Sequence, residues 1–200
     1  ASFPDNLDRG LDRGSAVVIL NSTSSGRPIA IIEASHVNAK RTAASAALAA
    51  RTLREGERVD CVAAIGCGFV NFETVRFLKT VFPDLSRLAI FDLDPNRAIQ
   101  FQQKCLKSFG LAEVNIVDRI ETALSASPLN SMATTPAKPH ISDLPCCVPR
   151  ATILHISLRD LSAEVILACD NMVDDADHVC RAQTSVHLAE QLTGGRDFIR

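Results

Sequence analysis

Two glycines that follow an apolar run could bring the backbone against a phosphate. The stretch Val59–Asn71 reads VDCVAAIGCGFVN, and its apolar run ends in Gly66 and Gly68. Gly66 would allow a tight turn, and Gly68 would let the backbone come close to a pyrophosphate. A helix after this turn would point free N–H groups and its positive dipole end at the same group. The chemistry that this spacing favours is dinucleotide binding.

An acidic residue at the end of the next apolar run would complete such a site. The stretch Leu88–Asp94 reads LAIFDLD. The Asp92 carboxylate could accept a hydrogen bond from a ribose 2′-hydroxyl and would repel a 2′-phosphate, which favours NAD over NADP. Asn71 replaces the third Gly of the usual motif, and Asp92 could also be an ordinary strand-end carboxylate. Asp94, which a Pro follows, is better suited to cap a helix.

Two further side chains could act on a substrate. Arg41, in AKRTAASAALAAR, shares a helical face with Val37 and Ser45 and could clamp a carboxylate through two hydrogen bonds. The spacing alone fits a solvated surface Arg at least as well. Asp160 follows the fifth apolar run of the nucleotide-binding region, at the edge where α/β proteins bind ligands, and could exchange protons with an amine or water. The alternative is a loop carboxylate that caps the next turn.

Alternating strands and helices must bring these residues together. Residues 1–14 are predicted to form a loop, and the turn residues between Ala16–Leu20 and Pro28–Ile32 predict a β-hairpin. Ser35 should cap a helix over His36–Arg54. Further strands are expected at Val59–Ile65, Leu88–Asp92, Val114–Val117, Asn130–Thr135, Ala151–Ile156 and Leu167–Val173, and helices at Phe72–Phe82, Pro95–Phe109, Arg119–Ser125, Leu161–Ile166 and Asp175–Leu192. This alternation predicts an α/β, Rossmann-type doubly wound parallel sheet.

Composition narrows the class of protein. The chain has 200 residues and is 46% hydrophobic, which suits one domain and part of a second. A net charge of −2 leaves no broad basic surface, so we expect no nucleic-acid partner. No apolar run reaches membrane-spanning length and no signal peptide is recognisable, so we expect no membrane partner. The seven scattered Cys predict a reduced, cytoplasmic protein, and the pair His178 and Cys180 is a poor metal site.

Three stretches together resemble the ornithine cyclodeaminase/mu-crystallin family. RPIAIIEASHVNAKRTAASAALAAR resembles the hairpin and helix before the family's nucleotide domain, AIGCGFVN resembles its glycine turn, and TILHISLRD resembles the segment with its acid/base carboxylate. The sequences of three segments are similar to those of the dehydrogenase branch that makes 2,3-diaminopropionate for siderophores and antibiotics: KRTAASAALAA, SLRDL and DDADHVCRAQTS.

The resemblance implies roles for individual residues. Arg41 would bind the substrate carboxylate, and Asp160 would be the catalytic acid. Glu164 stands where cyclodeaminases carry Lys, which favours the diaminopropionate branch. The residues implied to bind NAD are Gly66, Gly68, Phe69, Val70, Asn71, Asp92, Thr134 and Thr135. No metal is implied.

The resemblance also implies how the chain is divided. Residues 1–35 would be the remnant of a substrate and dimerisation domain, residues 36–56 a connecting helix, and residues 57–200 the NAD-binding domain. Family members are longer at both ends, so we expect a fragment of a homodimeric protein, which need not be active alone.

The implied reaction is the NAD-dependent oxidative hydrolysis of N-(2-amino-2-carboxyethyl)-L-glutamate. Its products would be 2,3-diaminopropionate, 2-oxoglutarate and NADH. Two alternatives stay open at this point. One is a cyclodeaminase-type lyase that returns the hydride to its substrate, and the other is a non-catalytic, crystallin-like protein that binds NAD or another ligand.

Overall fold

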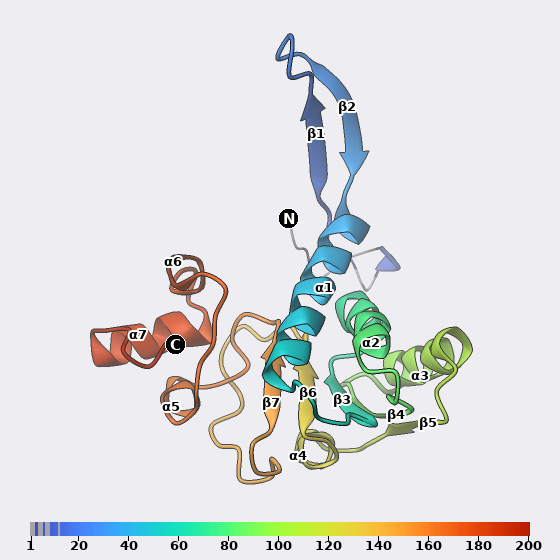
Figure 1. The fold of residues 1–200 in the computed structure, drawn as a ribbon, viewed down its shortest axis with the longest axis vertical. Coiled ribbons are helices and arrows are strands. Elements are labelled where there is room, and N and C mark those ends of the chain that lie inside the picture. The colour runs from blue at the N-terminus through green and yellow to red at the C-terminus, as the bar shows by residue number, and fades with distance from the viewer. Residues whose placement is uncertain (1–2, 4–5, 7–8, 12) are drawn as a thin grey trace.

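Five parallel strands form the sheet around which most of the chain is arranged (Figure 1). The structure is a computed structural model that describes residues 3, 6, 9–11 and 13–200, so part of the predicted loop over residues 1–14 lies outside the described residues. The strands follow the spatial order β5-β4-β3-β6-β7, which confirms the predicted Rossmann-type sheet. In chain order they are β3 (Cys61–Ile65), β4 (Arg87–Phe91), β5 (Glu113–Ile116), β6 (Leu129–Met132) and β7 (Thr152–His155).

The strand order reverses at β3. Ile65, its last residue, is paired with Phe91 of β4 on one side and with Met132 of β6 on the other. The two connections leave β3 and β6 in opposite directions, and this opens a crevice at the edge where the strands end. We call this edge the carboxyl edge, and it is where an open α/β sheet binds its ligands.

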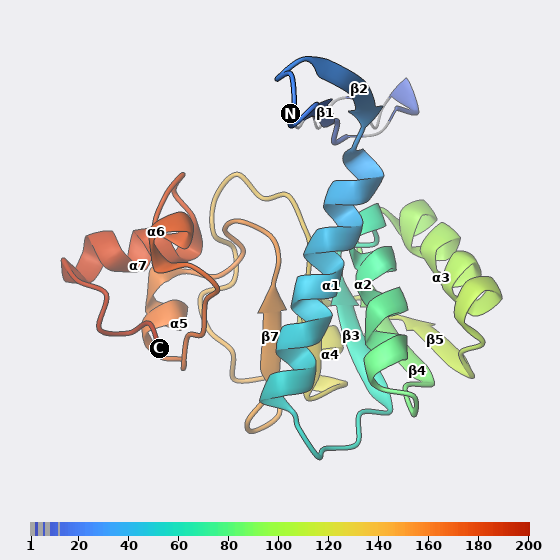
Figure 2. The same ribbon diagram turned by 45° about the horizontal axis from the view of Figure 1, so that its top comes forward.

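Helices cover both faces of the sheet, as a doubly wound fold requires. Helices α1 (Ser35–Leu53), α2 (Phe69–Val81) and α3 (Pro95–Phe109) lie on one face, and α4 (Ile120–Ser125) lies on the other (Figure 2). Successive side chains of a strand point to opposite faces. Accordingly, Val62 and Ala64 of β3 belong to one hydrophobic core, and Ala63 and Ile65 belong to the other.

Small residues let α1 pack closely against α2. The buried stripe of α1 consists of Ala39, Ala43, Ala47 and Ala50. The prediction that Ser35 caps this helix is wrong. The cap position is Ala34, which makes no side-chain cap bond, and the Ser35 N–H donates to the Glu33 carboxylate at 2.8 Å.

Helix α1 spans the sheet from edge to edge. At its start, the His36 ring lies 4.6 Å from the Phe69 ring at the beginning of α2. Just after its last residue, the Arg54 guanidinium donates to Pro128 O at 3.3 Å and to the Thr152 hydroxyl at 3.1 Å, both at the opposite edge of the sheet. The segment that precedes α1 therefore enters at the carboxyl edge.

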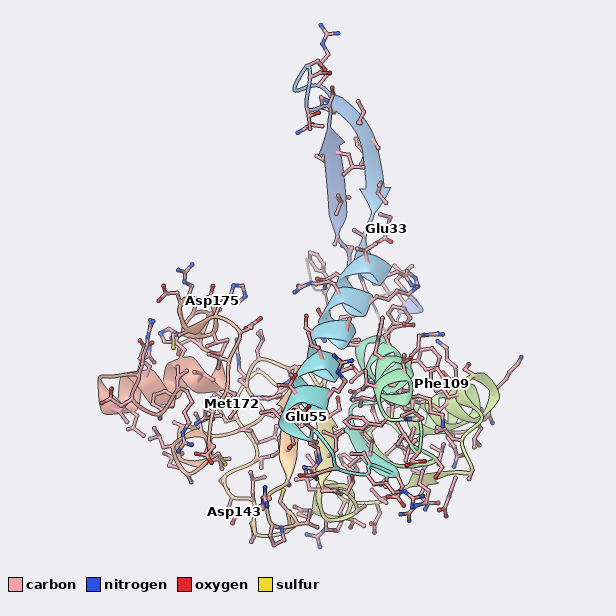
Figure 3. The ribbon with its side chains drawn as sticks, in the orientation of Figure 1. Glu33, Glu55, Phe109, Asp143, Met172 and Asp175 are labelled. Carbon is pink, nitrogen blue, oxygen red and sulfur yellow. The ribbon has the colours of Figure 1, made fainter. Side chains whose placement is uncertain are left out.

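That segment is the predicted antiparallel hairpin, formed by β1 (Val17–Asn21) and β2 (Pro28–Glu33). It extends away from the sheet, and Figure 3 shows Glu33 and Glu55 near the two ends of α1, with the hairpin beyond Glu33. Apolar side chains are exposed along the whole hairpin: Ile29 is 69% exposed and Ile31 is 73% exposed. Exposed apolar side chains in such number are typical of an interaction surface.

The chain after β7 differs from the prediction. The expected strand over Leu167–Val173 is wrong, because α5 (Ala163–Leu167) occupies its start and Asn171 makes only an isolated bridge to Ile199. The expected closing helix is two helices, α6 (Ala176–Val179) and α7 (Ser185–Thr193). They are separated where Ala182 and Gln183 adopt positive φ angles of 55° and 56°. No helix of the described residues is long and apolar enough to cross a bilayer.

Candidate functional site

Gly66 occupies a position that no other residue fits. Its φ is +89°, and a Cβ atom there would lie only 2.6 Å from Ala133 O and 3.2 Å from the Thr134 side chain. The Gly66 N–H donates to Phe91 O at 2.8 Å. The turn after β3 is therefore held between the ends of β4 and β6, in the middle of the carboxyl edge.

Gly68 lies at the cap position of α2 with a different environment. Its φ is −92° and its ψ is 178°, and a Cβ atom there would meet no described atom within 4 Å. No side chain of the described residues caps α2, so none accepts a hydrogen bond from the N–H groups of its first turn at this position. A 13-residue helix with an uncapped start suits a phosphate, which accepts these hydrogen bonds and interacts with the helix dipole.

Asn71 shapes this turn from inside. Its side chain is fully buried, and Nδ2 donates to Ile65 O at 2.8 Å and to Gly66 O at 2.7 Å. Its Oδ1 accepts a hydrogen bond of 2.6 Å from the Ser131 hydroxyl of β6. This use of both ends of the amide favours a positioning role over the predicted direct contact with a cofactor. The same contacts give a physical reason for Asn at the position of the third Gly.

Asp92 lies at the end of β4, next to the glycine turn. Its Oδ2 accepts from the Cys67 N–H at 2.7 Å, and its Oδ1 accepts from the Asp94 N–H at 2.9 Å. Arg97 of α3 donates to the same Oδ1 at 3.3 Å and is 40% exposed, whereas the Asp92 side chain is 7% exposed. Asp92 therefore fixes the turn, and the edge of its carboxylate is the part available to a ribose. Asp94 caps α3 as predicted, by accepting from Asn96 N–H and Arg97 N–H.

The other predicted cofactor residues lie around the same crevice. Phe69 and Val70 form the start of α2 and are half-buried. The Phe69 ring contacts His36 and lies 5.6 Å from the Lys104 ammonium. Thr134 and Thr135 follow β6; they are not part of the strand, which ends at Met132, and Thr135 is exposed. All four predictions of a cofactor contact stay predictions.

Asp160 is the centre of a polar cluster at the ends of β6 and β7. Its side chain is fully buried. Oδ1 accepts hydrogen bonds from the Thr134 hydroxyl and from His140 Nε2, the latter at 3.2 Å. Oδ2 accepts from the Ser157 hydroxyl and lies 3.3 Å from His155 Nε2. An ionised carboxylate offers about four acceptor positions, and these four groups occupy them.

These contacts determine the charge of Asp160. Burial alone would raise the pKa of the carboxyl, but the hydrogen bonds from His155, Ser157, Thr134 and His140 outweigh burial and hold that pKa well below its ordinary value. Asp160 is therefore ionised across the physiological range. His155 Nε2 also lies 3.3 Å from the Asp160 backbone nitrogen, so the tautomer of His155 decides whether it donates to the Asp160 carboxylate or accepts from the Asp160 N–H.

The cluster and the glycine turn form one continuous arrangement. Thr134 contacts the position of Gly66 with its methyl group and Asp160 with its hydroxyl. The sequence gives no signal that would have singled out His140, His155 or Arg97, because their partners are 5 to 20 positions away and depend on the fold.

Arg41 and Glu164 lie outside this cluster. Arg41 lies on the exposed face of α1, about 7.5 Å along the axis from His36. Its guanidinium donates to the Asn38 side chain at 3.0 and 2.7 Å. Glu164 is exposed in the first turn of α5. Neither side chain is brought to Asp160 by the described residues alone, so the predicted substrate contact of Arg41 stays a prediction.

One cavity lies at the other edge of the sheet. It has a volume of about 420 Å³ and is lined by Arg51, Arg54, Val59 and Phe82, among others, where α1 and α2 end. None of the predicted site residues lines it. This cavity is therefore separate from the candidate site.

Comparison with known proteins places the chain in a family. Residues 1–143 match the ornithine cyclodeaminase/mu-crystallin family. The chain belongs to this family. It is 28% identical over 174 residues to the N-((2S)-2-amino-2-carboxyethyl)-L-glutamate dehydrogenase of Staphylococcus aureus (strain NCTC 8325 / PS 47), a match that covers 84% of this chain and 49% of that protein.

Two other similarities bear on fold and function. The ornithine cyclodeaminase of Brucella abortus biovar 1 (strain 9-941) is 31% identical over 134 residues, which cover 66% of this chain and 35% of that protein. The crystal structure of CmnK superposes with a TM-score of 0.82 at 28% identity, over 96% of this chain and 57% of that one. The chain spans about half the length of the Staphylococcus relative, 49%, and about a third, 35%, of the Brucella one.

Proposed function

We propose that this chain is the nucleotide-binding part of an NAD-dependent amino-acid dehydrogenase. Its substrate would be N-(2-amino-2-carboxyethyl)-L-glutamate. The observation that carries the proposal is the continuity of two features, a glycine turn suited to a pyrophosphate and a buried carboxylate surrounded by proton-bearing groups. Thr134 joins them, since it contacts both the Gly66 position and Asp160.

The residues present fit NAD. The open space beside Gly68 and the free N–H groups of α2 would receive the pyrophosphate, and Asp92 would accept from the adenosine ribose. Phe69, Val70, Thr134 and Thr135 would line the path toward the nicotinamide. When bound, NAD supplies a hydride acceptor. The chain's own residues must orient the substrate amine, exclude stray water and move protons.

The proposed reaction balances without any further co-reactant. Oxidation breaks the C–H bond at the glutamate α-carbon, and the hydride reduces NAD to NADH. The secondary amine gives up its N–H proton, which leaves a C=N bond. Water adds to that carbon, the C–N bond breaks, and the nitrogen leaves as the amine of 2,3-diaminopropionate. The net products are 2,3-diaminopropionate, 2-oxoglutarate, NADH and one proton.

The substrate side of the site would be completed by parts of the protein outside this chain. The exposed apolar hairpin and the match to half of a longer relative support the assignment of residues 1–35 to a substrate and dimerisation domain. Residues 36–56 would then be the connecting helix and residues 57–200 the nucleotide domain. Arg41, on the exposed face of α1, would meet a substrate carboxylate at the junction. The intact protein would be a homodimer, and its seven unpaired Cys suit the cytoplasm.

A cyclodeaminase-type lyase is the second candidate, because the Brucella relative carries that name. Glu164, exposed where cyclodeaminases carry Lys, counts against it. A non-catalytic crystallin-like protein is the third, and the proton-bearing groups around Asp160 count against that.

Substrate turnover by the full-length protein separates the three candidates. It should be supplied with N-(2-amino-2-carboxyethyl)-L-glutamate and excess NAD while NADH and 2-oxoglutarate are measured together. The proposal predicts one NADH for each 2-oxoglutarate. Proline and ammonia from ornithine, without accumulation of NADH, would assign the protein to the lyases. Saturable NAD binding with no turnover of either substrate would favour the crystallin-like alternative.

A further inference from the structure

The polar cluster contains an imidazole that the sequence did not single out. His140 lies in the loop between β6 and β7, and its side chain is 43% exposed, whereas Asp160 beside it is fully buried. The loop is fixed at this point because the His140 and Ile141 N–H groups both donate to Asp160 O at 3.0 Å. The backbone of His140 is therefore held in place next to Asp160, while part of its imidazole is exposed.

The contact with Asp160 determines which nitrogen of His140 carries the proton. An ionised carboxylate can only accept hydrogen bonds, so Nε2, at 3.2 Å from Oδ1, must be the donor. In the neutral ring the lone pair then lies on Nδ1. No described residue forms a hydrogen bond with Nδ1 of His140. A neutral imidazole with a carboxylate behind one nitrogen and a free lone pair on the other is suited to accept a proton and to release it again.

Asp160 itself is poorly placed for that exchange. It has no solvent-exposed surface, and its acceptor positions are directed at Thr134, Ser157, His140 and His155. A substrate amine could reach it only by displacing one of these groups. Exposure therefore distinguishes His140 from Asp160 as the group that a substrate can touch.

We propose that His140 is the residue that exchanges protons with the substrate, and that Asp160 is the positioning residue that orients it. The inference rests on the proposed function and adds to it. His140 Nδ1 would take the N–H proton when the secondary amine is oxidised and return a proton to the departing nitrogen of 2,3-diaminopropionate. Between the two steps the Asp160 carboxylate would stabilise the imidazolium.

The titratable and charged groups near His140 determine which variants can serve as controls. Asp160, which follows β7, contacts the His140 ring, and His155 of β7 contacts the other oxygen of the same carboxylate. The Arg159 guanidinium is directed at Ala137 O and Ala182 O, and Lys138 is exposed in the same loop as His140. His155 is the second imidazole of the cluster, and His178 is an exposed imidazole in α6 outside it.

The test is the pH profile of kcat/KM for the full-length protein and for His140→Gln, His155→Gln and His178→Gln. The unmodified protein should lose activity toward low pH, with an inflection where the proton-accepting imidazole becomes protonated. His140→Gln should lower kcat by roughly 10²–10⁴-fold and abolish this inflection, with NAD affinity unchanged. His178→Gln should match the unmodified protein, and His155→Gln should retain the inflection.

A second variant protects the test against a folding defect. Added imidazole should restore part of the turnover of His140→Ala, which it could not do for a misfolded protein. His140→Gln with kcat within tenfold of the unmodified protein and an intact inflection would overturn the role of His140 and leave the proposed function standing. An unmodified protein that binds NAD but turns over no substrate at any pH would overturn both.

Discussion

Exchanging each of the two glycines of the turn for alanine should have opposite consequences. In Gly66→Ala, the new methyl group would lie 2.6 Å from Ala133 O, on a residue with a φ of +89°. In Gly68→Ala, the methyl group would meet no described atom within 4 Å, on a residue with a φ of −92°. The first change conflicts with the fold, and the second conflicts only with a ligand that needs the space.

The magnitudes follow from these two environments. A left-handed conformation costs a residue with a Cβ about 1–2 kcal/mol, and overpacking costs about 1–3 kcal/mol, so Gly66→Ala should lower the free energy of unfolding by about 2–5 kcal/mol. For a chain of this size, the Tm should fall by roughly 4–20 °C. Gly68→Ala loses a good helix cap but gains from a less flexible unfolded chain, so its stability should change by less than about 1 kcal/mol. If the methyl group removes one backbone hydrogen bond to a phosphate, NAD affinity should fall roughly tenfold to a hundredfold.

Thermal melts and calorimetric titrations of NAD on the full-length protein measure both quantities. The expected result is a low Tm for Gly66→Ala, and an unchanged Tm with weakened NAD binding for Gly68→Ala. Gly68→Ala with unaltered NAD affinity would refute the placement of the pyrophosphate beside this residue. Gly66→Ala with an unaltered Tm would refute the close approach to Ala133.

Three further predictions concern the carboxylates and the extent of the chain. Asp92→Ala should weaken NAD binding by roughly tenfold or more and relatively favour NADP, because it removes the ribose acceptor and frees Arg97. Asp94→Ala should instead cost about 1 kcal/mol of stability through the lost helix cap and leave NAD binding intact. Titrations with both dinucleotides measure these affinities, and equal effects of the two variants would contradict the prediction. Because folding lowers the pKa of Asp160, the ionised carboxylate stabilises the fold above its unfolded pKa of about 3.9, and this contribution is lost as the pH falls through the lower folded pKa. The Tm difference between the unmodified protein and Asp160→Asn should therefore be constant above about pH 5 and shrink below about pH 4. A Tm difference that grows on acidification would contradict the direction of the pKa shift. The isolated 200-residue chain should bind NAD but turn over little substrate, and turnover near that of the full-length protein would contradict the assignment of residues 1–35 to a larger substrate domain.

The parts of the fold that local patterns determine could be predicted from the sequence. Continuous apolar runs identified β3 and β4 because both faces of these strands are buried. The Ala-rich segment identified α1, and Gly66 and Gly68 identified the turn. The cap of α1 was misplaced by one residue, because the Ser35 N–H is satisfied by Glu33 and the Ser35 side chain is not needed.

The segment after β7 could not be predicted, because its apolar residues serve a different purpose. Leu167 ends a short helix that the Ser162 hydroxyl caps, and it packs against the second core. The Asn171 side chain donates to Ile166 O at 2.7 Å and to Phe198 O at 3.3 Å, which holds the chain away from the sheet. An apolar run of this length fits a buried strand and a packed loop equally well.

The site was predicted in its residue types and not in its contacts. Asp160 was identified, but its burial and its four neighbours depend on how β6, β7 and the intervening loop meet. Asn71 was identified as a substitute for Gly, but only the fold reveals that it connects the turn to Ser131. Contacts between residues 20 to 60 positions apart leave no local pattern in a single sequence.

A crystal structure of the full-length protein with NAD would test the central claim most directly. We predict that the pyrophosphate lies against the N–H groups at the start of α2, beside Gly68, that the adenosine ribose meets Asp92, and that the nicotinamide lies at the ends of β6 and β7 near His140. NAD bound at the opposite edge of the sheet, by the cavity that Arg51 and Phe82 line, or an empty glycine turn at saturating NAD, would contradict the account.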